Sequence, residues 1–322
     1  MNSTERRAEE VTGVSWSSVE PLSREDAATV AAMRGVLLPH KGQLQGTAAR
    51  KPFDEIMERT PAAEGVTYEA DTVGDVKGWW CRPVGARPDE AILYLHGGWY
   101  VWGTALAYRH LAGQIAARAG AAVFVADYRR APEHPFPAAV LDAQATYRGL
   151  VERGLRRIAV VGDSAGGGLA LALLSLTTAV TAPGGVVPVG AVALSPVTDL
   201  TLVSPSWASR ADADLYFTRP QVAALVAAYM AGQDRANPLA SPLYGKLDGL
   251  PPILVHVGGD EVLLDDSLLY VARAVSAGVN AKVAVWHGMQ HVFPSGVGTL
   301  NAASKSLDAI GAFLSARLAI AV

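Results

Sequence analysis

A serine between glycines is a residue of this chain that could do covalent chemistry. Residues 162–166 read GDSAG, which fits the pattern G-x-S-x-G around Ser164. The β-type run RIAVV (157–161) precedes it and a helix-forming run follows, so Ser164 falls on a sharp strand–turn–helix junction. Glycines leave room at such a turn, and the helix N-terminus favours a developing oxyanion. The pattern predicts a nucleophile for acyl transfer; the alternative is a turn whose serine only caps a helix.

A serine hydroxyl needs a base, and the base needs an acid that orients it. A nucleophile on this kind of turn is followed along the chain by the acid and then by the histidine. The run PILVHV (252–257) is soon followed by Asp260, and the run AKVAVW (281–286) is followed by a loop that reaches His291. Because parallel strands end at one edge of a sheet, we expect Asp260 to orient His291, which deprotonates the serine.

Three neighbouring residues compete for these roles. Asp265 and Asp266 precede the helical run SLLYVARAV, where a capping role is the favoured interpretation. His287 directly follows a strand, so its direction is tied to the sheet, whereas His291 lies in a loop that can carry it to the serine. Either histidine could instead be a surface or packing residue.

Acyl transfer also needs N–H groups aimed at the oxyanion of the tetrahedral intermediate. Such groups come from the residue after the nucleophile, here Ala165, and from the loop after the third strand, here His96-Gly97-Gly98-Trp99. We expect Gly98 and Ala165 to donate, with Gly97 or Trp99 nearby. Trp99 can donate only if its backbone angles suit an L-residue.

The elements that must hold these groups alternate along the chain. Eight β-type runs are expected, at 66–70, 76–80, 91–95, 121–126, 157–161, 190–195, 252–257 and 281–286. Helical stretches are expected at 104–118, 137–153, 165–180, 267–277 and 299–318. The alternation predicts an α/β fold with a mostly parallel eight-stranded sheet and helices on both faces. The first two runs are close in sequence and predict an antiparallel hairpin.

Two segments fall outside this alternation. Residues 1–50 are expected to be helical, with Ser23 as an N-cap, and to form part of a cap. The rest, 51–322, is expected to be the catalytic domain. It carries a cap insertion around 200–235, in which Thr218 and Pro220 begin a helix.

The blocks around these residues resemble the hormone-sensitive-lipase-like carboxylesterases, the bacterial group IV esterases of the α/β-hydrolase fold, in the branch that carries GDSAGG. The matching blocks are LYLHGG (93–98), DYRRAPEHPFPAA (127–139), VVGDSAGGGLALA (160–172), SPVTDL (195–200), LPPILVHVGGDEVLLDDS (250–267) and WHGMQHVF (286–293).

The resemblance implies a triad of Ser164, Asp260 and His291, an oxyanion hole and a helical cap. It also implies hydrolysis of short- to medium-chain carboxylic esters. A homodimer through the last strand is a family-level expectation. Alternatives are a lactone hydrolase or deacetylase with the same triad, and a ligand receptor without catalysis. The acyl-enzyme mechanism requires no metal and no organic cofactor.

Two positions depart from the family pattern. Trp99 stands where a third glycine is usual, and Arg130 stands where leucine is common. A bulky Trp99 beside the site favours short acyl chains. Within the same blocks, the charged residues of DYRRAPEHPFPAA are expected to form a structural ion-pair and turn network rather than to act in catalysis: Asp127, Arg129, Glu133 and His134.

Composition excludes several other classes of protein. The 322 residues are half hydrophobic, and 27 basic against 30 acidic residues argue against a nucleic-acid or membrane-surface partner. One cysteine, Cys81, excludes an intramolecular disulfide. The charged N-terminus MNSTERRAEE lacks the apolar region of a signal peptide, so we expect a cytoplasmic protein that acts on a small-molecule ester.

Overall fold

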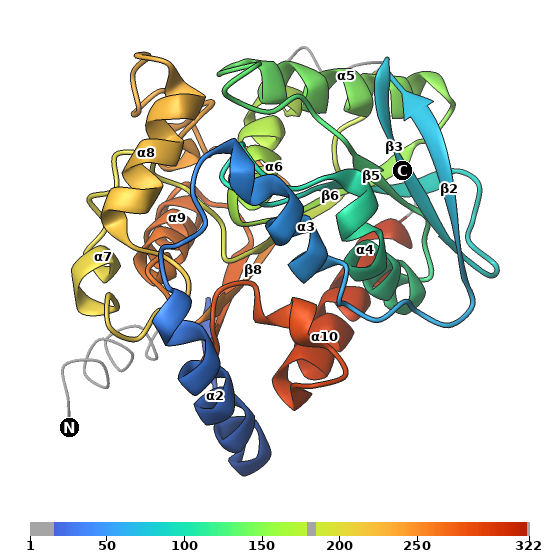
Figure 1. Ribbon diagram of the computed structural model, residues 1–322. Helices are drawn as coiled ribbons and strands as arrows, with labels where there is room; N and C mark the ends of the chain where they lie inside the picture. The colour runs from blue at the N-terminus through green and yellow to red at the C-terminus, as the bar shows by residue number, and fades with distance from the viewer. Residues whose placement is uncertain (1–15, 179–184, 321–322) are drawn as a thin grey trace.

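The computed structural model describes residues 16–178 and 185–320 (Figure 1). The N-terminus MNSTERRAEE, for which the sequence predicts no signal peptide, lies outside these ranges. So do the last residues of the helix expected at 165–180. Among the described residues, no helix combines the length and the apolar character needed to cross a bilayer.

One sheet runs through the molecule, in the strand order β1-β9-β8-β7-β6-β4-β5-β3-β2. The strands are β1 (Ser17–Glu20), β2 (Val66–Val73), β3 (Val76–Pro83), β4 (Glu90–Leu95), β5 (Val123–Ala126), β6 (Arg157–Asp163), β7 (Gly190–Leu194), β8 (Ile253–Gly258) and β9 (Ala281–Trp286). β2 and β3 form the expected antiparallel hairpin, and β3 also pairs antiparallel with β5. All other neighbours are parallel, as predicted.

The sheet has one strand more than expected. β1 pairs in parallel with β9, with Ser17 opposite Val283 and Glu20 opposite Trp286. The helical expectation for residues 1–50 is therefore wrong at β1, because the sequence SSVE has no apolar run that would predict a strand. β1 thus pairs along β9 from Val283 to Trp286, and the dimer expected through the last strand stays a prediction.

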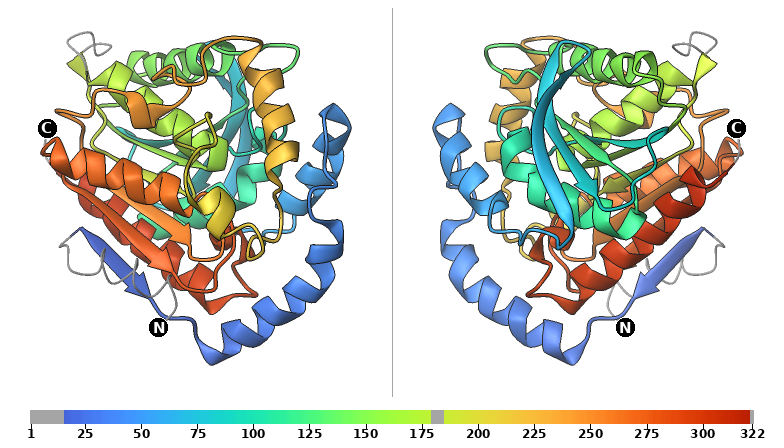
Figure 2. Two further views of the ribbon diagram at one scale, coloured as in Figure 1. Left: turned by 90° about the vertical axis from the view of Figure 1, so that its left-hand side faces the viewer. Right: turned by 90° about the vertical axis from the view of Figure 1, so that its right-hand side faces the viewer.

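Helices cover both faces of the sheet (Figure 2). They are α4 (Ala105–Ala119), α5 (Ala138–Glu152), α6 (Ser164–Thr177), α9 (Leu264–Ser276) and α10 (Asn301–Leu318). Side chains of β4 alternate between two cores. Ile92 and Tyr94 pack on the side of α4 and α10, whereas Leu93 and Leu95 pack on the side of α5, α6 and α9. Burial on both faces explains the continuous apolar runs of the sequence.

The remaining helices lie outside the layered core. They are α2 (Arg24–Leu37), α3 (Arg50–Met57), α7 (Ser206–Ser209) and α8 (Arg219–Met230), with short 3₁₀ turns η1 (Leu38–His40), η2 (Thr47–Ala49), η4 (Pro242–Tyr244) and η5 (Phe293–Gly296). The caps predicted from the sequence are confirmed: the Ser23 side chain accepts from the N–H of Asp26, and Thr218 forms a capping box with Gln221.

The chain between α2 and α3 passes beside α8 (Figures 1 and 2). The side chain of Gln221 in α8 donates to the carbonyl of Leu44 over 2.6 Å, and the N–H of Gly42 donates to the carbonyl of Tyr216 over 3.0 Å. The N-terminal segment and the insertion around α7 and α8 are thus joined directly, over the C-terminal edge of the parallel strands.

Candidate active site

Ser164 lies at the junction of β6 and α6, as the sequence predicts. Its φ of +53° is the left-handed conformation of a sharp turn, and the residue is buried. The turn depends on a close approach of two backbones. A Cβ at Gly166 would lie 2.0 Å from the carbonyl oxygen of Leu95, so only glycine fits there. The turn thereby brings the serine to the end of β4, where the glycine loop begins.

His291 reaches Ser164 from the loop after β9. Its Nε2 atom lies 2.9 Å from Oγ of Ser164, which is hydrogen-bond distance for a base and its nucleophile. The backbone N–H of His287, the alternative base, donates to the carbonyl of Glu20 in the edge strand β1. The structure therefore brings together the serine and the histidine chosen from the sequence.

The acid beside His291 is Glu261 rather than Asp260. Oε1 of Glu261 lies 3.1 Å from Nδ1 of His291, and the carboxylate is fully buried. Asp260 is partly exposed, and its Oδ2 lies 3.6 Å from Nη2 of Arg34 in α2. The expected contact between Asp260 and His291 is therefore wrong. The two residues are consecutive, so their side chains leave the loop in different directions, and the candidates expected from the sequence do not include Glu261.

Further hydrogen bonds hold the Glu261 carboxylate in place. Its Oε2 accepts from the hydroxyl of Ser195 over 2.7 Å and from the N–H of Gly258 over 2.9 Å. The same Ser195 hydroxyl accepts from the N–H of Val292, over 3.1 Å. One serine at the end of β7 thus links the acid to the residue that follows His291.

The surroundings of His291 set its pKa. Burial disfavours the charged imidazolium, but the carboxylates of Glu261, Asp214 and Asp163 outweigh this and raise the pKa of His291 above its usual value. An imidazole that a buried carboxylate holds in place suits proton transfer from a serine hydroxyl.

The glycine loop after β4 lies beside this serine. The N–H of Gly97 donates to Oδ1 of Asp163 over 2.9 Å, so the expectation that Gly97 donates to an oxyanion is wrong. Within the described part of the chain, no hydrogen bond is recorded for the backbone N–H of Gly98, Trp99 or Ala165. These three groups remain available to a ligand oxygen.

Asp163 is the anchor of that loop. Its carboxylate also accepts from the hydroxyls of Tyr94, over 2.8 Å, and Tyr108, over 3.1 Å. Burial raises the pKa of Asp163 to about 6, although these donors favour the ionised form. The residue before the nucleophile thus fixes the position of the loop that faces the nucleophile.

Trp99 adopts a left-handed backbone conformation. Its φ is +53°, a left-handed value that costs a non-glycine residue about 1 to 3 kcal/mol. Its indole is buried and meets the ring of Phe217 edge-on, with centroids 5.4 Å apart. The Phe217 ring in turn meets the imidazole of His291 edge-on at 5.1 Å. Trp99 and Phe217 therefore form an aromatic wall beside the base.

A family profile described as alpha/beta hydrolase fold matches residues 92–295. That range contains the sharp turn at Ser164, the glycine loop after β4 and the loop after β9 that carries His291. The chain belongs to this family.

Similar proteins carry the names of ester-cleaving enzymes. An acetyl-hydrolase of Streptomyces hygroscopicus is 41% identical over 246 residues, which cover 76% of this chain and 81% of that protein. An esterase of Acinetobacter venetianus is 31% identical over 79% of this chain and 84% of its own length.

A solved esterase from the bacterial hormone-sensitive lipase family superposes with a TM-score of 0.84 at 38% identity. The match covers 92% of this chain and 99% of that one. The resemblance to hormone-sensitive-lipase-like esterases is thereby confirmed.

The charged residues of DYRRAPEHPFPAA bind other parts of the fold. Arg129 forms a two-pronged contact with Asp142, and Glu133 pairs with Arg50 of α3. Arg130, whose consequence the sequence left open, donates to the carbonyl of Gly103 over 2.6 Å. These contacts agree with the structural network expected from the sequence. The Arg130 contact also holds Gly103, which comes shortly after the glycine loop.

The two aspartates at the start of α9 also have structural surroundings. Asp266 is buried, and its carboxylate accepts from the N–H groups of Thr198 and Asp199 and from the hydroxyl of Ser204. It therefore binds the loop after β7 rather than capping its own helix. The N–H of Asp265 donates to the hydroxyl of Ser206 over 3.1 Å.

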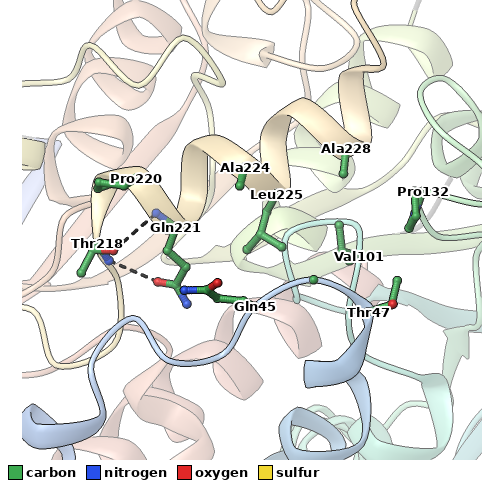
Figure 3. Close-up of a pocket in the computed structure, with 11 residues that line it drawn as sticks. Gln45, Thr47, Val101, Pro132, Thr218, Pro220, Gln221, Ala224, Leu225 and Ala228 are labelled. Carbon is green, nitrogen blue, oxygen red and sulfur yellow. Dashed lines mark hydrogen bonds between the residues drawn. The ribbon is translucent and has the colours of Figure 1, made fainter.

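A cavity of about 520 Å³ opens between the N-terminal segment and α8 (Figure 3). Its lining is uncharged and mostly apolar: Gln45, Gly46, Thr47, Val101, Pro132, Thr218, Pro220, Gln221, Ala224, Leu225 and Ala228. Val101 follows the glycine loop, and its backbone N–H donates to the carbonyl of Gly98. Thr218 is the residue after Phe217. Ser164 and His291 are not among the residues that line this cavity, so it lies outside the hydrogen-bonded site.

Within residues 16–178 and 185–320, no group of three or more His, Cys, Asp or Glu side chains is arranged to hold a metal ion.

Proposed function

We propose that the protein hydrolyses short- to medium-chain carboxylic esters, with Ser164 as nucleophile, His291 as base and Glu261 as the orienting acid. The observation that carries this proposal is the pair of contacts on one imidazole, 2.9 Å to the serine and 3.1 Å to the glutamate. Membership of a family whose members are named esterases agrees with it.

In the first half of the reaction, Nε2 of His291 takes the hydroxyl proton as Oγ of Ser164 attacks the ester carbonyl. Glu261 stabilises the imidazolium that forms and keeps Nδ1 as the protonated nitrogen. The tetrahedral intermediate collapses, the imidazolium gives its proton to the leaving alcohol, and an acyl-serine remains. Water then repeats the attack, releasing the carboxylic acid and restoring the serine hydroxyl.

The charge on the tetrahedral intermediate requires donors that are already in place. We assign this role to the backbone N–H groups of Gly98, Trp99 and Ala165, which have no recorded partner among the described residues. Trp99 stands where the family has a third glycine. Its left-handed conformation keeps the backbone N–H of this position in the loop. The N-terminus of α6 adds its dipole to the same site.

Two features of the structure bear on the size and charge of the substrate. Trp99 and Phe217 narrow the space beside His291, which favours a small acyl group. The cavity between the N-terminal segment and α8 has no charged lining residue, so it suits a neutral, mostly apolar group. We infer that the N-terminal segment and the α7–α8 insertion together form the helical cap of the catalytic domain.

A deacetylase that uses the same residues is the second candidate. The observation that favours it is the relative named acetyl-hydrolase, at 41% identity. Acetyl esters and acetylated metabolites offer the same acetyl carbonyl to Ser164, and they differ only in the leaving group.

A cytoplasmic location and a homodimer remain predictions, which cell fractionation and sedimentation would test.

The proposed function is tested by trapping the nucleophile. The protein is incubated with an organophosphonate that transfers its phosphonyl group to activated serines, and the adduct is mapped by mass spectrometry. We expect one adduct, on Ser164, and turnover of chromogenic acetyl and butanoyl esters that Ser164→Ala abolishes. A folded wild-type protein that neither reacts nor turns over any ester would reject an acyl-transfer function and favour a ligand receptor.

A further inference from the structure

A buried carboxylate outside the proposed catalytic set joins two loops of the site. Asp214 lies between α7 and α8 and is fully buried. Its Oδ1 accepts from the N–H groups of Tyr216, over 2.7 Å, and Phe217, over 2.9 Å. Its Oδ2 accepts from the N–H of Val262, over 3.0 Å. One side chain therefore folds its own loop and fastens that loop to the segment after β8.

These two segments border His291 on different sides. Phe217 places its ring edge-on to the imidazole at 5.1 Å, and Val262 directly follows the glutamate that contacts Nδ1. A change in the distance between the two segments would therefore change the space in which the imidazole is held.

We propose that Asp214 is a positioning residue, which fastens the loop that carries Phe217 to the loop that carries Glu261 and so keeps the imidazole between them in its productive orientation. This inference rests on the proposed role of that imidazole as the base.

The N-terminal segment grips the same loop from outside. Nζ of Lys41 donates to the carbonyl of Asp214 over 2.7 Å, and Nη2 of Arg34 donates to the carbonyl of Ala213 over 2.9 Å. Cations thus hold the outer side of the loop, while the Asp214 carboxylate holds its inner side.

Charge provides a readout that a purely structural role would not give. The carboxylates that face His291 are Glu261 from the β8–α9 loop, Asp214 from the α7–α8 loop and Asp163 from the end of β6. Burial lowers the pKa of His291, and these three groups raise it. Removal of the Asp214 charge should therefore lower the pKa of His291.

The test compares Asp214→Asn with Asp26→Asn. In Asp214→Asn, the amide oxygen can still accept from the two loop N–H groups, but its NH₂ faces the N–H of Val262, so the tie between segments is lost. Asp26 is a matched control, since it is buried and accepts from the N–H groups of Asn301 and Ala302 at the start of α10. Both variants should lose thermal stability.

Only Asp214→Asn should lower kcat, by about tenfold with KM little changed. Only Asp214→Asn should also move the acid limb of the kcat/KM profile about half a pH unit lower. An Asp214→Asn enzyme with the kcat and acid limb of the Asp26 variant would overturn the proposal. If Asp214→Asn does not fold, Asp214→Ser offers a smaller acceptor for the loop and is held to the same outcomes.

A measurement without substrate separates this inference from the proposed function. The imidazole resonances of His291, assigned with His291→Gln, are titrated by NMR in the wild type and in Asp214→Asn. A lower pKa in the variant supports the arrangement even if no ester is turned over, and an unchanged pKa contradicts it. Failure of the wild type to react with an organophosphonate would instead reject the proposed function.

Discussion

Nδ1 of His291 lies 3.1 Å from Oε1 of Glu261, while the neighbouring Asp260 lies beside Arg34 of α2. The acid that faces the base is thus one residue further along the chain and one methylene longer than the sequence motif predicts. The remaining carboxylate oxygen of Glu261 is bound by Ser195 and by the N–H of Gly258, so its position does not depend on solvent.

Activity should fall on the acid side of neutrality. Burial by itself lowers the pKa of His291, but three buried carboxylates have the larger combined effect. The pKa of His291 is therefore above its usual value. Because only the neutral imidazole can accept the serine proton, kcat/KM should fall as the pH drops through a value above the ordinary histidine pKa. A profile of kcat/KM between about pH 5 and pH 9 checks this. An acid limb below the ordinary histidine pKa would contradict it.

Gly166→Ala should prevent correct folding of the elbow. The new Cβ would meet the carbonyl oxygens of Leu95 and His96 at 2.0 and 2.3 Å, so a loss of about 3 kcal/mol or complete loss of folding is expected. Gly35→Ala is the matched control. Gly35 lies inside α2 with open space around it, so alanine there should raise stability by about 0.5 to 1 kcal/mol. Urea unfolding of both variants measures the difference, and equal effects would argue against the close approach.

Trp99→Gly should widen the range of acyl chains. Glycine adopts the φ of +53° without strain, so the backbone N–H should stay in place while the wall against Phe217 is removed. We expect kcat for acetyl esters to be retained and kcat/KM for octanoyl and longer esters to rise by about tenfold. Trp79→Phe, on β3 away from the serine, is the control and should leave the acyl preference unchanged. A wild-type maximum at long chains would contradict the proposed small acyl site.

The sequence predicted the nucleophile and the base because each depends on local context. Ser164 requires a strand, a tight turn and a helix in succession, and these leave a direct pattern of apolar runs and glycines. His291 follows from the order of strand ends. The acid could not be chosen in the same way, because Asp260 and Glu261 are adjacent and only the direction of each side chain separates them. The signal in the sequence that favours a buried acid at this point is the apolar run that directly follows Glu261.

Other differences also arise from tertiary contacts. Gly97 could not be recognised as the partner of Asp163, since residues 66 positions apart form that bond. β1 could not be predicted because a short polar edge strand is defined by its partner β9 rather than by its own pattern. The sequence did not show whether an L-residue could take the place of glycine at position 99. The φ of +53° shows that the loop imposes a left-handed conformation on Trp99.

The most direct test of the catalytic arrangement is the comparison of Glu261→Gln with Asp260→Asn in steady-state hydrolysis of a chromogenic acetyl ester. We expect Glu261→Gln to lower kcat by about 10²- to 10⁴-fold, because the amide no longer stabilises the imidazolium. Asp260→Asn removes a charge that faces Arg34, Arg210 and His287 but leaves the contacts of His291 in place, so it should retain kcat within about threefold. A severe loss in Asp260→Asn together with an active Glu261→Gln enzyme would contradict the account.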